Sequence, residues 1–215
     1  MNAKIIIADD HRMVREGLRS LIESQPGLSM IAEARDGLEA VGLSKKHNPD
    51  LVVMDISMPN LNGIEATRRI KEGMDKTKVI ILSMHADRRY VAEALKAGAD
   101  GYLLKDAAFV ELSQAIRTVL QGKRFLSPAI ADLLIDGYLA REDLTQPGAY
   151  NLLSAREREV LQMIAEGQAT KQIAKELNLS VKTIETYRKH IMDKLDLRSV
   201  AQLTKYAIRE GLTSP

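Results

Sequence analysis

Acidic side chains follow two short apolar runs in the first half of the chain. Asp9 and Asp10 come directly after the run 5–8, and Asp55 comes directly after the run 51–54. Carboxylates held ~4 Å apart repel by about 4 kcal/mol per pair at an effective dielectric constant of about 20, so they need a counterion. Magnesium takes one or two carboxylates and keeps several of its waters. A fold that brings Asp9, Asp10 and Asp55 together would therefore make a magnesium site.

Two more polar residues stand at the ends of apolar runs. Ser83 closes the run 79–82, and Lys105 follows the run 101–104. A lysine ammonium can pair with a phosphoryl oxygen, and an aspartate carboxylate can attack phosphorus to form an acyl phosphate. A capping or surface role explains any one of these residues alone, but not one at each strand end. The turn 9–11 lacks a glycine-rich phosphate loop, which argues against a nucleotide-binding fold.

The elements that must position these residues alternate along residues 1–122. Continuous apolar or β-branched runs predict strands at 4–8, 28–34, 50–54, 78–83 and 101–104, and helical patterns lie near 14–22, 37–46, 64–72, 87–97 and 112–120. Such alternation predicts an α/β fold, a five-stranded parallel sheet that is doubly wound, with helices on both faces. In such sheets function gathers at the carboxyl ends of the strands.

The last third of the chain has a purely helical pattern. Ser154 and Glu157 form a capping box, Gly167 offers a helix stop, a second helix is expected over 170–177, and a fourth opens at Ser199. The third helix has an apolar stripe of Ile184, Tyr187, Ile191 and Leu195 and an opposite polar stripe of Lys182, Glu185, Thr186, Lys189 and Asp193. A short helix, a tight turn and a longer helix with an exposed polar face predict a helix-turn-helix.

Charge and composition fit this division. Residues 1–122 hold 17 basic and 17 acidic side chains, 123–148 hold 3 and 4, and 149–215 hold 11 and 8. The small basic excess of the last segment is compatible with a nucleic-acid partner. The chain has no cysteine, which excludes disulfides, thiolate metal sites and a cysteine nucleophile. No apolar run reaches ~20 residues and no signal-peptide pattern is present, so we expect a cytoplasmic protein with no membrane partner.

The first segment resembles the receiver domain of two-component response regulators. The resemblance covers residues 3–121 and rests on Asp9-Asp10-His11, the run 54–63, Ser83, the run 97–102 and Lys105. It implies a flavodoxin-like fold in which Asp55 is the phosphoacceptor and Lys105, Ser83 and Tyr102 respond to the phosphoryl group, Tyr102 as the switch. It also implies Mg²⁺ held by Asp10, Asp55, the backbone carbonyl of Ser57, and Asp9 through water.

The last segment is similar to the LuxR-type DNA-binding domain over about 150–212. The similarity rests on the runs 153–161, 164–167, 171–174 and 179–187. Together the two domains resemble the NarL/FixJ group of response regulators. By position the similarity implies base contacts from Glu185, Thr186 and Lys189, and phosphate contacts from Lys182, Thr183, Arg188, His190 and Lys194.

These inferences predict three segments and one function. We expect a receiver at 1–122, a linker with a short helix at 123–148, and a four-helix, all-α DNA-binding domain at 149–215. The expected protein is a transcriptional regulator, not an enzyme, that a sensor histidine kinase phosphorylates on Asp55. It would bind double-stranded DNA as a homodimer, through either the receiver or the fourth helix.

Two alternatives remain at this stage. The first is a DNA-binding regulator whose receiver is vestigial, against which the intact set of Asp10, Asp55, Ser83 and Lys105 argues. The second is an aspartyl-phosphate phosphatase. Such an enzyme would place a second acid near the nucleophile to protonate the leaving group. Ser57, two residues beyond Asp55, is poorly suited to that task.

Overall fold

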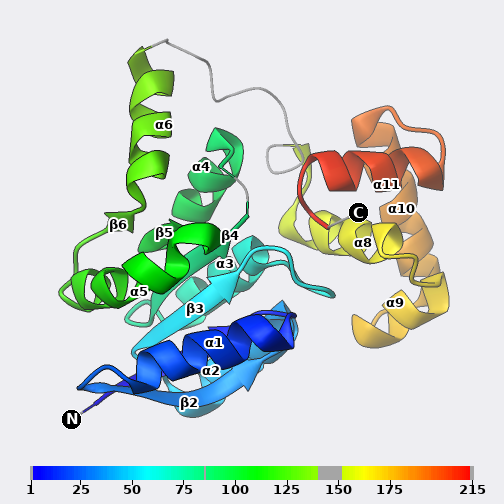
Figure 1. Ribbon diagram of the computed structural model, residues 1–215. Helices are drawn as coiled ribbons and strands as arrows, with labels where there is room; N and C mark the ends of the chain where they lie inside the picture. The colour runs from blue at the N-terminus through cyan, green and yellow to red at the C-terminus, as the bar shows by residue number, and fades with distance from the viewer. Residues whose placement is uncertain (1, 85, 140–151, 214–215) are drawn as a thin grey trace. The chain divides into compact units, whose positions relative to one another are not determined.

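The computed structural model describes residues 2–84, 86–139 and 152–213. The chain forms two compact units, one mainly of residues up to 144 and the other mainly of residues from 145 onward (Figure 1). Each unit has its own hydrophobic core, and each is described here by itself.

The first unit is built on a parallel sheet of six strands, not the five that the sequence predicted. In chain order the strands are β1 (Ala3–Ala8), β2 (Leu28–Ala34), β3 (Leu51–Asp55), β4 (Lys78–Ser83), β5 (Gly101–Leu104) and β6 (Phe125–Leu126). Their order across the sheet is β2-β1-β3-β4-β5-β6. The predicted α/β fold is confirmed, and the five predicted strands are found within one residue of their expected ends.

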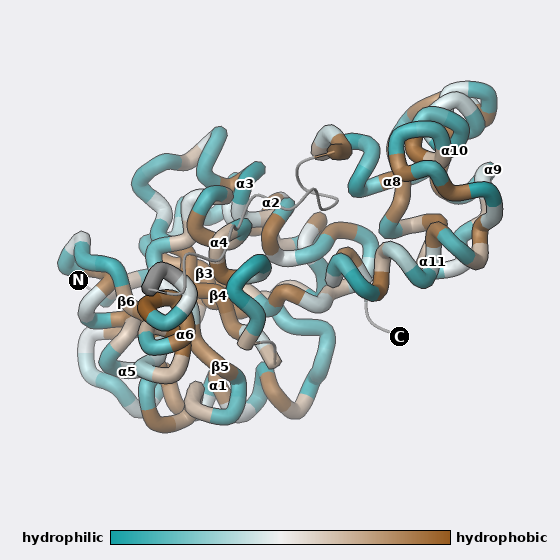
Figure 2. The backbone as a smooth tube through the Cα atoms, turned by 90° about the horizontal axis from the view of Figure 1, so that it is seen from above, coloured by the Kyte–Doolittle hydropathy of each residue, from teal (hydrophilic) through white to brown (hydrophobic). Residues whose placement is uncertain are grey.

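Helices connect the strands and cover both faces of the sheet (Figure 1). Helices α1 (Arg12–Glu23) and α5 (Lys105–Leu120) pack together, as do α2 (Gly37–His47) and α3 (Gly63–Gly73), while α4 (Arg88–Lys96) contacts α3. Because helices cover both faces, the central strands are apolar throughout, and Figure 2 shows β3, β4 and β5 as brown segments. The core includes the fully buried Ile5, Ile7, Val53, Ile80 and Leu103.

The sixth strand and the next helix lie in the segment that the sequence assigned to a linker. Strand β6 pairs with β5, so that Leu126 lies opposite Tyr102, and α6 (Pro128–Leu139) contacts α4 and β5. The short helix predicted from residue 128 is therefore present and packs on the first unit. The polar stretch 142–148, which the sequence assigned to the linker proper, lies outside the described residues.

In its described part, the second unit contains helices α8 (Ala155–Ala165), α9 (Thr170–Glu176), α10 (Val181–Leu195) and α11 (Val200–Arg209). The predicted capping box opens α8, because Ser154 accepts from the Glu157 amide and Glu157 accepts from the Ser154 amide. Gly167 follows α8 with φ of 79°, a conformation that glycine adopts at little cost. Helix α10 contacts both α8 and α9. The predicted all-α fold of this segment is confirmed, with the four expected helices among the described residues.

Candidate functional site

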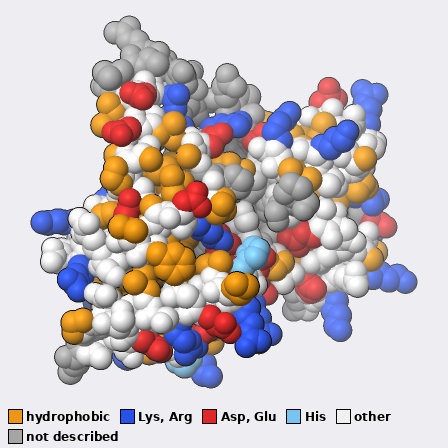
Figure 3. Space-filling view, in the orientation of Figure 1, with side chains coloured by type: hydrophobic (Ala, Val, Ile, Leu, Met, Phe, Trp, Pro, Cys, Tyr) orange, Lys and Arg blue, Asp and Glu red, His pale blue; other side chains and the backbone are white. Residues whose placement is uncertain are grey.

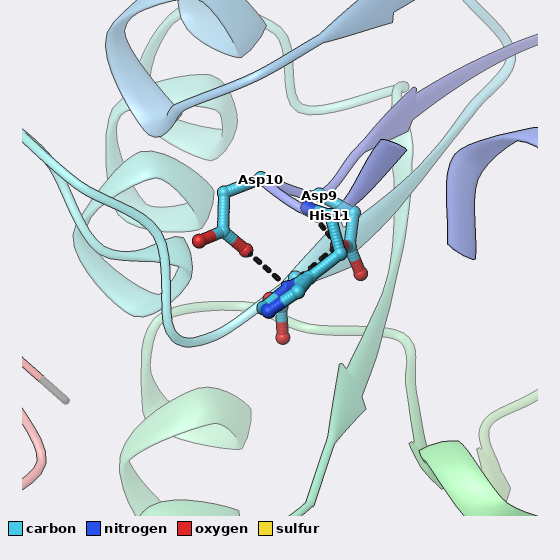
Figure 4. A group of neighbouring side chains, drawn as sticks. Asp9, Asp10 and His11 are labelled. Atoms are coloured by element: carbon cyan, nitrogen blue, oxygen red, sulfur yellow. Dashed lines mark hydrogen bonds and ion pairs between the residues drawn. The ribbon is translucent and has the colours of Figure 1, made fainter. Parts of the chain in front are cut away.

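An acidic pocket lies where β1 and β3 end. Figure 4 shows Asp9, Asp10 and His11 in the turn between β1 and α1, with their side chains gathered together. Asp55, the last residue of β3, belongs to the same group, and one ligand atom from each of the four residues lies within 4.8 Å of the others. Parallel strands end at one edge of the sheet, which is why Asp10 and Asp55 meet here although they lie far apart in the sequence.

Lys105 forms ion pairs with two of these carboxylates. Its Nζ lies 2.8 Å from Asp9 Oδ2 and 2.8 Å from Asp55 Oδ2, and the two aspartate side chains are almost fully buried. Lys105 is the first residue of α5, directly after β5, so the cation comes from the end of a strand that β4 separates from β3. The ammonium therefore lies directly against one oxygen of each carboxylate.

The charge of Asp55 is costly in this setting. Burial raises the pKa of its carboxyl to about 6, and the negative charges of Asp9 and Asp10 act in the same direction, while Lys105 opposes them. Burial alone would lower the pKa of Lys105, but the attraction of Asp55 and Asp9 outweighs it and raises that pKa. The pocket therefore favours the arrival of further positive charge.

The donor set fits a hard divalent cation. Three carboxylates and one ammonium leave a formal charge of −2, which one divalent cation cancels. Asp9 Oδ2 and Asp55 Oδ2 are buried, and among the described residues the polar partner found for each is the Lys105 ammonium, at 2.8 Å. Oxygen ligands of this kind are those that Mg²⁺ prefers. Asp10 Oδ1 lies 2.7 Å from His11 Nδ1, so a cation on Asp10 would compete with that imidazole.

The loop after β3 depends on a glycine that the sequence motifs contained but whose role they did not reveal. The Gly63 amide donates to the carbonyl of Ile56 at 2.9 Å. A Cβ on Gly63 would lie 1.9 Å from the backbone oxygen of Asp55, far inside contact distance. Glycine is therefore required for α3 to start against the strand end. Ser57, whose carbonyl was expected to bind the metal, lies in this loop, partly buried.

The two expected switch residues are in contact with each other. Ser83 ends β4 and Tyr102 lies in β5, and both are fully buried. Burial raises the pKa of the Tyr102 hydroxyl well above its ordinary value, and a hydrogen bond with the Ser83 side chain opposes this rise. The tyrosine hydroxyl therefore reaches the strand end that flanks Asp55.

Helix α10 presents the side chains expected to contact DNA. Ile184 and Ile191 are buried, and Tyr187 and Leu195 pack partly buried on the same core, as the apolar stripe predicted. The expected contact residues that are exposed are Lys182, Glu185, Thr186, Lys189, His190 and Lys194, while Thr183 and Arg188 are partly buried.

Some of these polar groups already have partners within the unit. Lys194 Nζ lies 2.7 Å from Glu157 Oε2 on α8, so a phosphate contact by Lys194 would compete with that ion pair. The Thr186 hydroxyl donates to the carbonyl of Lys182 at 2.9 Å, which leaves its oxygen free only to accept. The Thr183 and Ser180 hydroxyls lie 2.7 Å apart at the start of the helix.

Arg198 was not among the sequence predictions but borders the same surface. It is exposed just before α11, and it lines a hollow together with Glu185, Arg188 and Lys189. Its place follows from the turn between α10 and α11, where Asp196 has φ of 50°. No periodic pattern in the sequence marks such a turn residue as part of a helix face.

Comparisons with known proteins agree with this geometry. Residues 5–117 match the response regulator receiver domain, and residues 151–207 match the bacterial regulatory proteins of the luxR family. The chain belongs to the LuxR-family response regulators. It is a DNA-binding transcriptional regulator of the NarL/FixJ group, as the sequence motifs predicted.

Relatives of this response regulator span almost its whole length. It is 39% identical over 213 residues to the oxygen regulatory protein NreC of Staphylococcus haemolyticus, covering 97% of this chain and 98% of that one. The NreC of Staphylococcus carnosus is 38% identical over 213 residues, with the same coverage. The two units described here thus occur together in these relatives.

Solved structures of response regulators are similar too. A LuxR-family two-component response regulator from Aurantimonas is 42% identical with a TM-score of 0.63, covering 65% of this chain and 99% of that one. RcsB from Salmonella enterica serovar Typhimurium, bound to a promoter in the presence of a phosphomimetic, is 29% identical with a TM-score of 0.62. That match covers 99% of this chain and 100% of the RcsB chain.

Among the described residues, no helix of this regulator is both long and apolar enough to cross a membrane.

Proposed function

We propose that a sensor histidine kinase phosphorylates this regulator on Asp55, and that the phosphoryl group controls its binding to double-stranded DNA. The observation that carries the proposal is the contact of Lys105 Nζ with both Asp9 and Asp55 at 2.8 Å in an acidic pocket. A buried carboxylate beside a cation and two further carboxylates is suited to receive a phosphoryl group.

The residues of the pocket divide the work of phosphoryl transfer. An oxygen of Asp55 forms a bond to phosphorus while the bond from phosphorus to the donor's imidazole nitrogen breaks, and the imidazole leaves. Lys105, which pairs with the Asp55 carboxylate before the transfer, then pairs with the phosphoryl oxygens. Asp10, Asp55 and the carbonyl of Ser57 would hold Mg²⁺, with Asp9 bound through water. The metal supplies positive charge to the phosphoryl oxygens when it is bound.

Ser83 and Tyr102 would transmit the change. The Ser83 hydroxyl, at the end of β4, can donate to a phosphoryl group on Asp55, and it forms a hydrogen bond with the Tyr102 hydroxyl. A new bond from Ser83 to the phosphoryl group would alter that contact. Tyr102 would then settle in a different position, and the surface around β5 would change with it.

The proposed DNA contact is made by α10. Its exposed face carries Glu185, Thr186 and Lys189, which we assign to base edges in the major groove. Lys182, Thr183, Arg188, His190 and Lys194 are assigned to phosphates. Neighbours of similar fold support this role: one is an RcsB–DNA complex, 29% identical with a TM-score of 0.60. Because its partner is DNA, we propose that the regulator acts in the cytoplasm.

Phosphorylation would favour a homodimer, since one short recognition helix contacts too few base pairs for useful specificity. A neighbouring structure contains two RcsB dimers on two DNAs. The receiver offers a surface for pairing: Met13 on α1 is 85% exposed, and Phe109 and Val110 on α5 are 58% and 84% exposed. In the second unit, Val200 at the start of α11 is 47% exposed, so the receiver surface is the more apolar candidate.

We propose a regulator and not an enzyme. A phosphatase with an aspartyl intermediate would turn over small phosphoesters, and the non-acidic Ser57 argues against that activity. A regulator with a vestigial receiver would bind its operator equally well with and without a phosphodonor. The intact set of Asp9, Asp10, Asp55 and Lys105 in one pocket argues against that alternative.

Labelling by a small acyl phosphate in Mg²⁺ tests the assignment. Asp55→Asn should abolish it, because an amide is a poor nucleophile, and Asp10→Ala should weaken it through loss of metal. Intact-mass measurement before and after acid and hydroxylamine treatment identifies the acyl phosphate. Stoichiometric labelling that survives in Asp55→Asn would overturn the assignment.

A further inference from the structure

One buried charge of the receiver has no part in the site as described so far. Arg15, on the first turns of α1, is 6% exposed. Its Nε lies 3.0 Å from Glu33 Oε2 on β2, and its Nη1 donates to the backbone carbonyl of Asp9 at 2.7 Å. A buried guanidinium normally needs an ion pair and further acceptors. Here one of those acceptors is the backbone of the acidic pocket itself.

Asp9 is fixed from four directions by these contacts. Its amide donates to Ala34 on β2 at 3.2 Å, and its carbonyl accepts from Arg15. Its Oδ1 accepts from the His11 amide at 2.8 Å, and its Oδ2 faces Lys105. Of the two backbone bonds, only the one to the carbonyl depends on a side chain. A single substitution at Arg15 can therefore release the peptide that joins Asp9 to Asp10.

That peptide determines where Asp10 points. The carbonyl of Asp9 and the amide of Asp10 share one rigid plane. A bond that fixes the carbonyl also fixes the direction in which the Asp10 backbone continues. The side chain of Asp10 is 34% exposed and, within the described residues, its carboxylate contacts His11. Its position over the pocket therefore depends on the backbone that carries it.

We infer that Arg15, anchored by Glu33, is a positioning residue that holds the Asp9–Asp10 peptide for Mg²⁺ binding. The inference rests on the proposed magnesium site. Groups that orient metal ligands from behind typically change metal affinity 10- to 100-fold when they are removed. Among the described residues the hydrogen bonds of Arg15 go to Glu33 and to the Asp9 carbonyl and not to Asp55, so its loss should affect the metal requirement and leave the transfer step at saturating metal nearly unchanged.

The chain provides a matched control on the same glutamate. Arg19 also pairs with Glu33, but its side chain is 46% exposed, and its partners in the described part of the chain are Glu33 and Glu23, not the loop after β1. Arg19→Met removes an arginine from Glu33 just as Arg15→Met does, without freeing the Asp9 carbonyl. An effect that came only from weakening the Glu33 ion pairs would appear in both variants.

The experiment measures labelling by acetyl phosphate against Mg²⁺ concentration in the full-length protein, together with Mg²⁺ binding by calorimetry in the absence of phosphodonor. For Arg15→Met we expect the half-saturating Mg²⁺ concentration and the dissociation constant to rise about tenfold or more. The maximal rate should stay within about threefold of wild type. Arg15→Lys keeps the charge but replaces two separate donor nitrogens, Nε and Nη1, with a single one, so it should give an intermediate rise. Arg19→Met should match wild type within about twofold.

Each outcome bears on the inference. If Arg15→Met folds and has an unchanged Mg²⁺ affinity, the inference is wrong while the proposed site stands. If Arg15→Met does not fold, Arg15→Lys and Glu33→Gln decide, and wild-type affinity in both overturns the inference. A wild-type protein that neither binds Mg²⁺ nor is labelled contradicts the proposed function itself, and the inference with it.

Discussion

Asp55 is ionised only at a cost in the metal-free receiver. Burial raises the pKa of its carboxyl from 3.8 to about 6, and the neighbouring carboxylates add to the effect. The burial that lowers the stability of the folded protein also leaves the carboxylate with few water contacts. The carboxylate therefore binds a cation or a phosphoryl group more readily. The pocket is therefore expected to be less stable near neutral pH than a neutral pocket of the same shape.

The raised pKa of Asp55 makes the free energy of unfolding depend on pH, with a definite sign. Between about pH 4 and pH 6 the folded protein binds more protons at Asp55 than the unfolded chain does, so the free energy of unfolding falls as pH rises through that window. In Mg²⁺-free buffer, Asp55→Asn should lack this fall and be more stable than wild type at pH 7 by about 1–3 kcal/mol. Urea unfolding of both proteins from pH 4 to pH 8 measures the difference. Parallel curves for the two proteins would show that Asp55 is not so perturbed.

Alanine substitutions of Glu185 and Lys189 should affect DNA binding in different ways, since both residues are exposed on α10 but differ in charge. Glu185→Ala should hardly weaken nonspecific binding and should relax preference at one base pair. Lys189→Ala should cost about 1–3 kcal/mol at one base pair if it contacts guanine. If it contacts phosphate instead, all duplexes should weaken alike and the salt slope should fall by about one.

Affinities for operator and random duplex at two salt concentrations separate these cases. We favour the base contact for Lys189, because residues in the middle of the outward face point toward the floor of the groove. Equal losses on both duplexes in Glu185→Ala, with operator discrimination unchanged, would mean that α10 does not lie in the major groove as proposed.

At the scale of elements, the segment after α5 is hydrogen-bonded directly to β5, the strand that carries Tyr102. The Ser127 amide donates to the Tyr102 carbonyl at 3.0 Å, and the Ser127 hydroxyl donates to Glu111 on α5. The Leu104 amide, next to Lys105, lies 3.4 Å from the same hydroxyl. One buried serine therefore joins β5, α5 and the start of α6.

Ser127→Ala should loosen this junction. It removes the hydroxyl bond to the Glu111 carboxylate, so we expect a loss of about 1–2 kcal/mol in the free energy of unfolding. Exchange of the Phe125 and Ser127 amides with solvent deuterium should speed up. Ser20→Ala, an exposed serine of α1, serves as the control. Unchanged exchange at β6 would contradict the role given to Ser127.

The sequence predicted the elements whose signals are local and long enough. Short apolar or β-branched runs marked β1 to β5, and the capping box of Ser154 and Glu157 marked the start of α8. Strand β6 has two residues, too few to show any period, and it forms because its backbone can pair with β5. Its existence depends on a tertiary neighbour that no local pattern contains.

The same distinction applies to the site. The acids and Lys105 could be placed together because parallel strands end at one edge of a sheet. The bond from His11 to Asp10 and the bond from Arg15 to the Asp9 carbonyl depend on side-chain directions across the turn. Gly63 was visible as a glycine, but the contact that requires it is with the backbone of Asp55.

At the scale of the whole molecule, the apolar surface of the receiver predicts how copies pair. Figure 3 shows hydrophobic side chains on the face of the first unit over α5 and α6. Phe109 and Val110 of α5 and Ile135 of α6 are exposed. Val110→Asp should keep the phosphorylated protein monomeric in sedimentation experiments, because pairing would bury a charge. Ile135→Asp on α6 should not. A dimer in phosphorylated Val110→Asp as stable as wild type would exclude the surface on α1 and α5.

The central claim is that the phosphoryl group on Asp55 controls DNA binding, and one measurement tests it most directly. An operator is first selected from random duplexes with phosphorylated wild type. The affinity for that operator is then measured with and without acetyl phosphate, in wild type and in Asp55→Asn. We predict that phosphodonor tightens binding by wild type about tenfold or more, with two half-sites ~10 bp apart, and leaves Asp55→Asn unchanged. Equal affinity of wild type in both conditions would contradict the account.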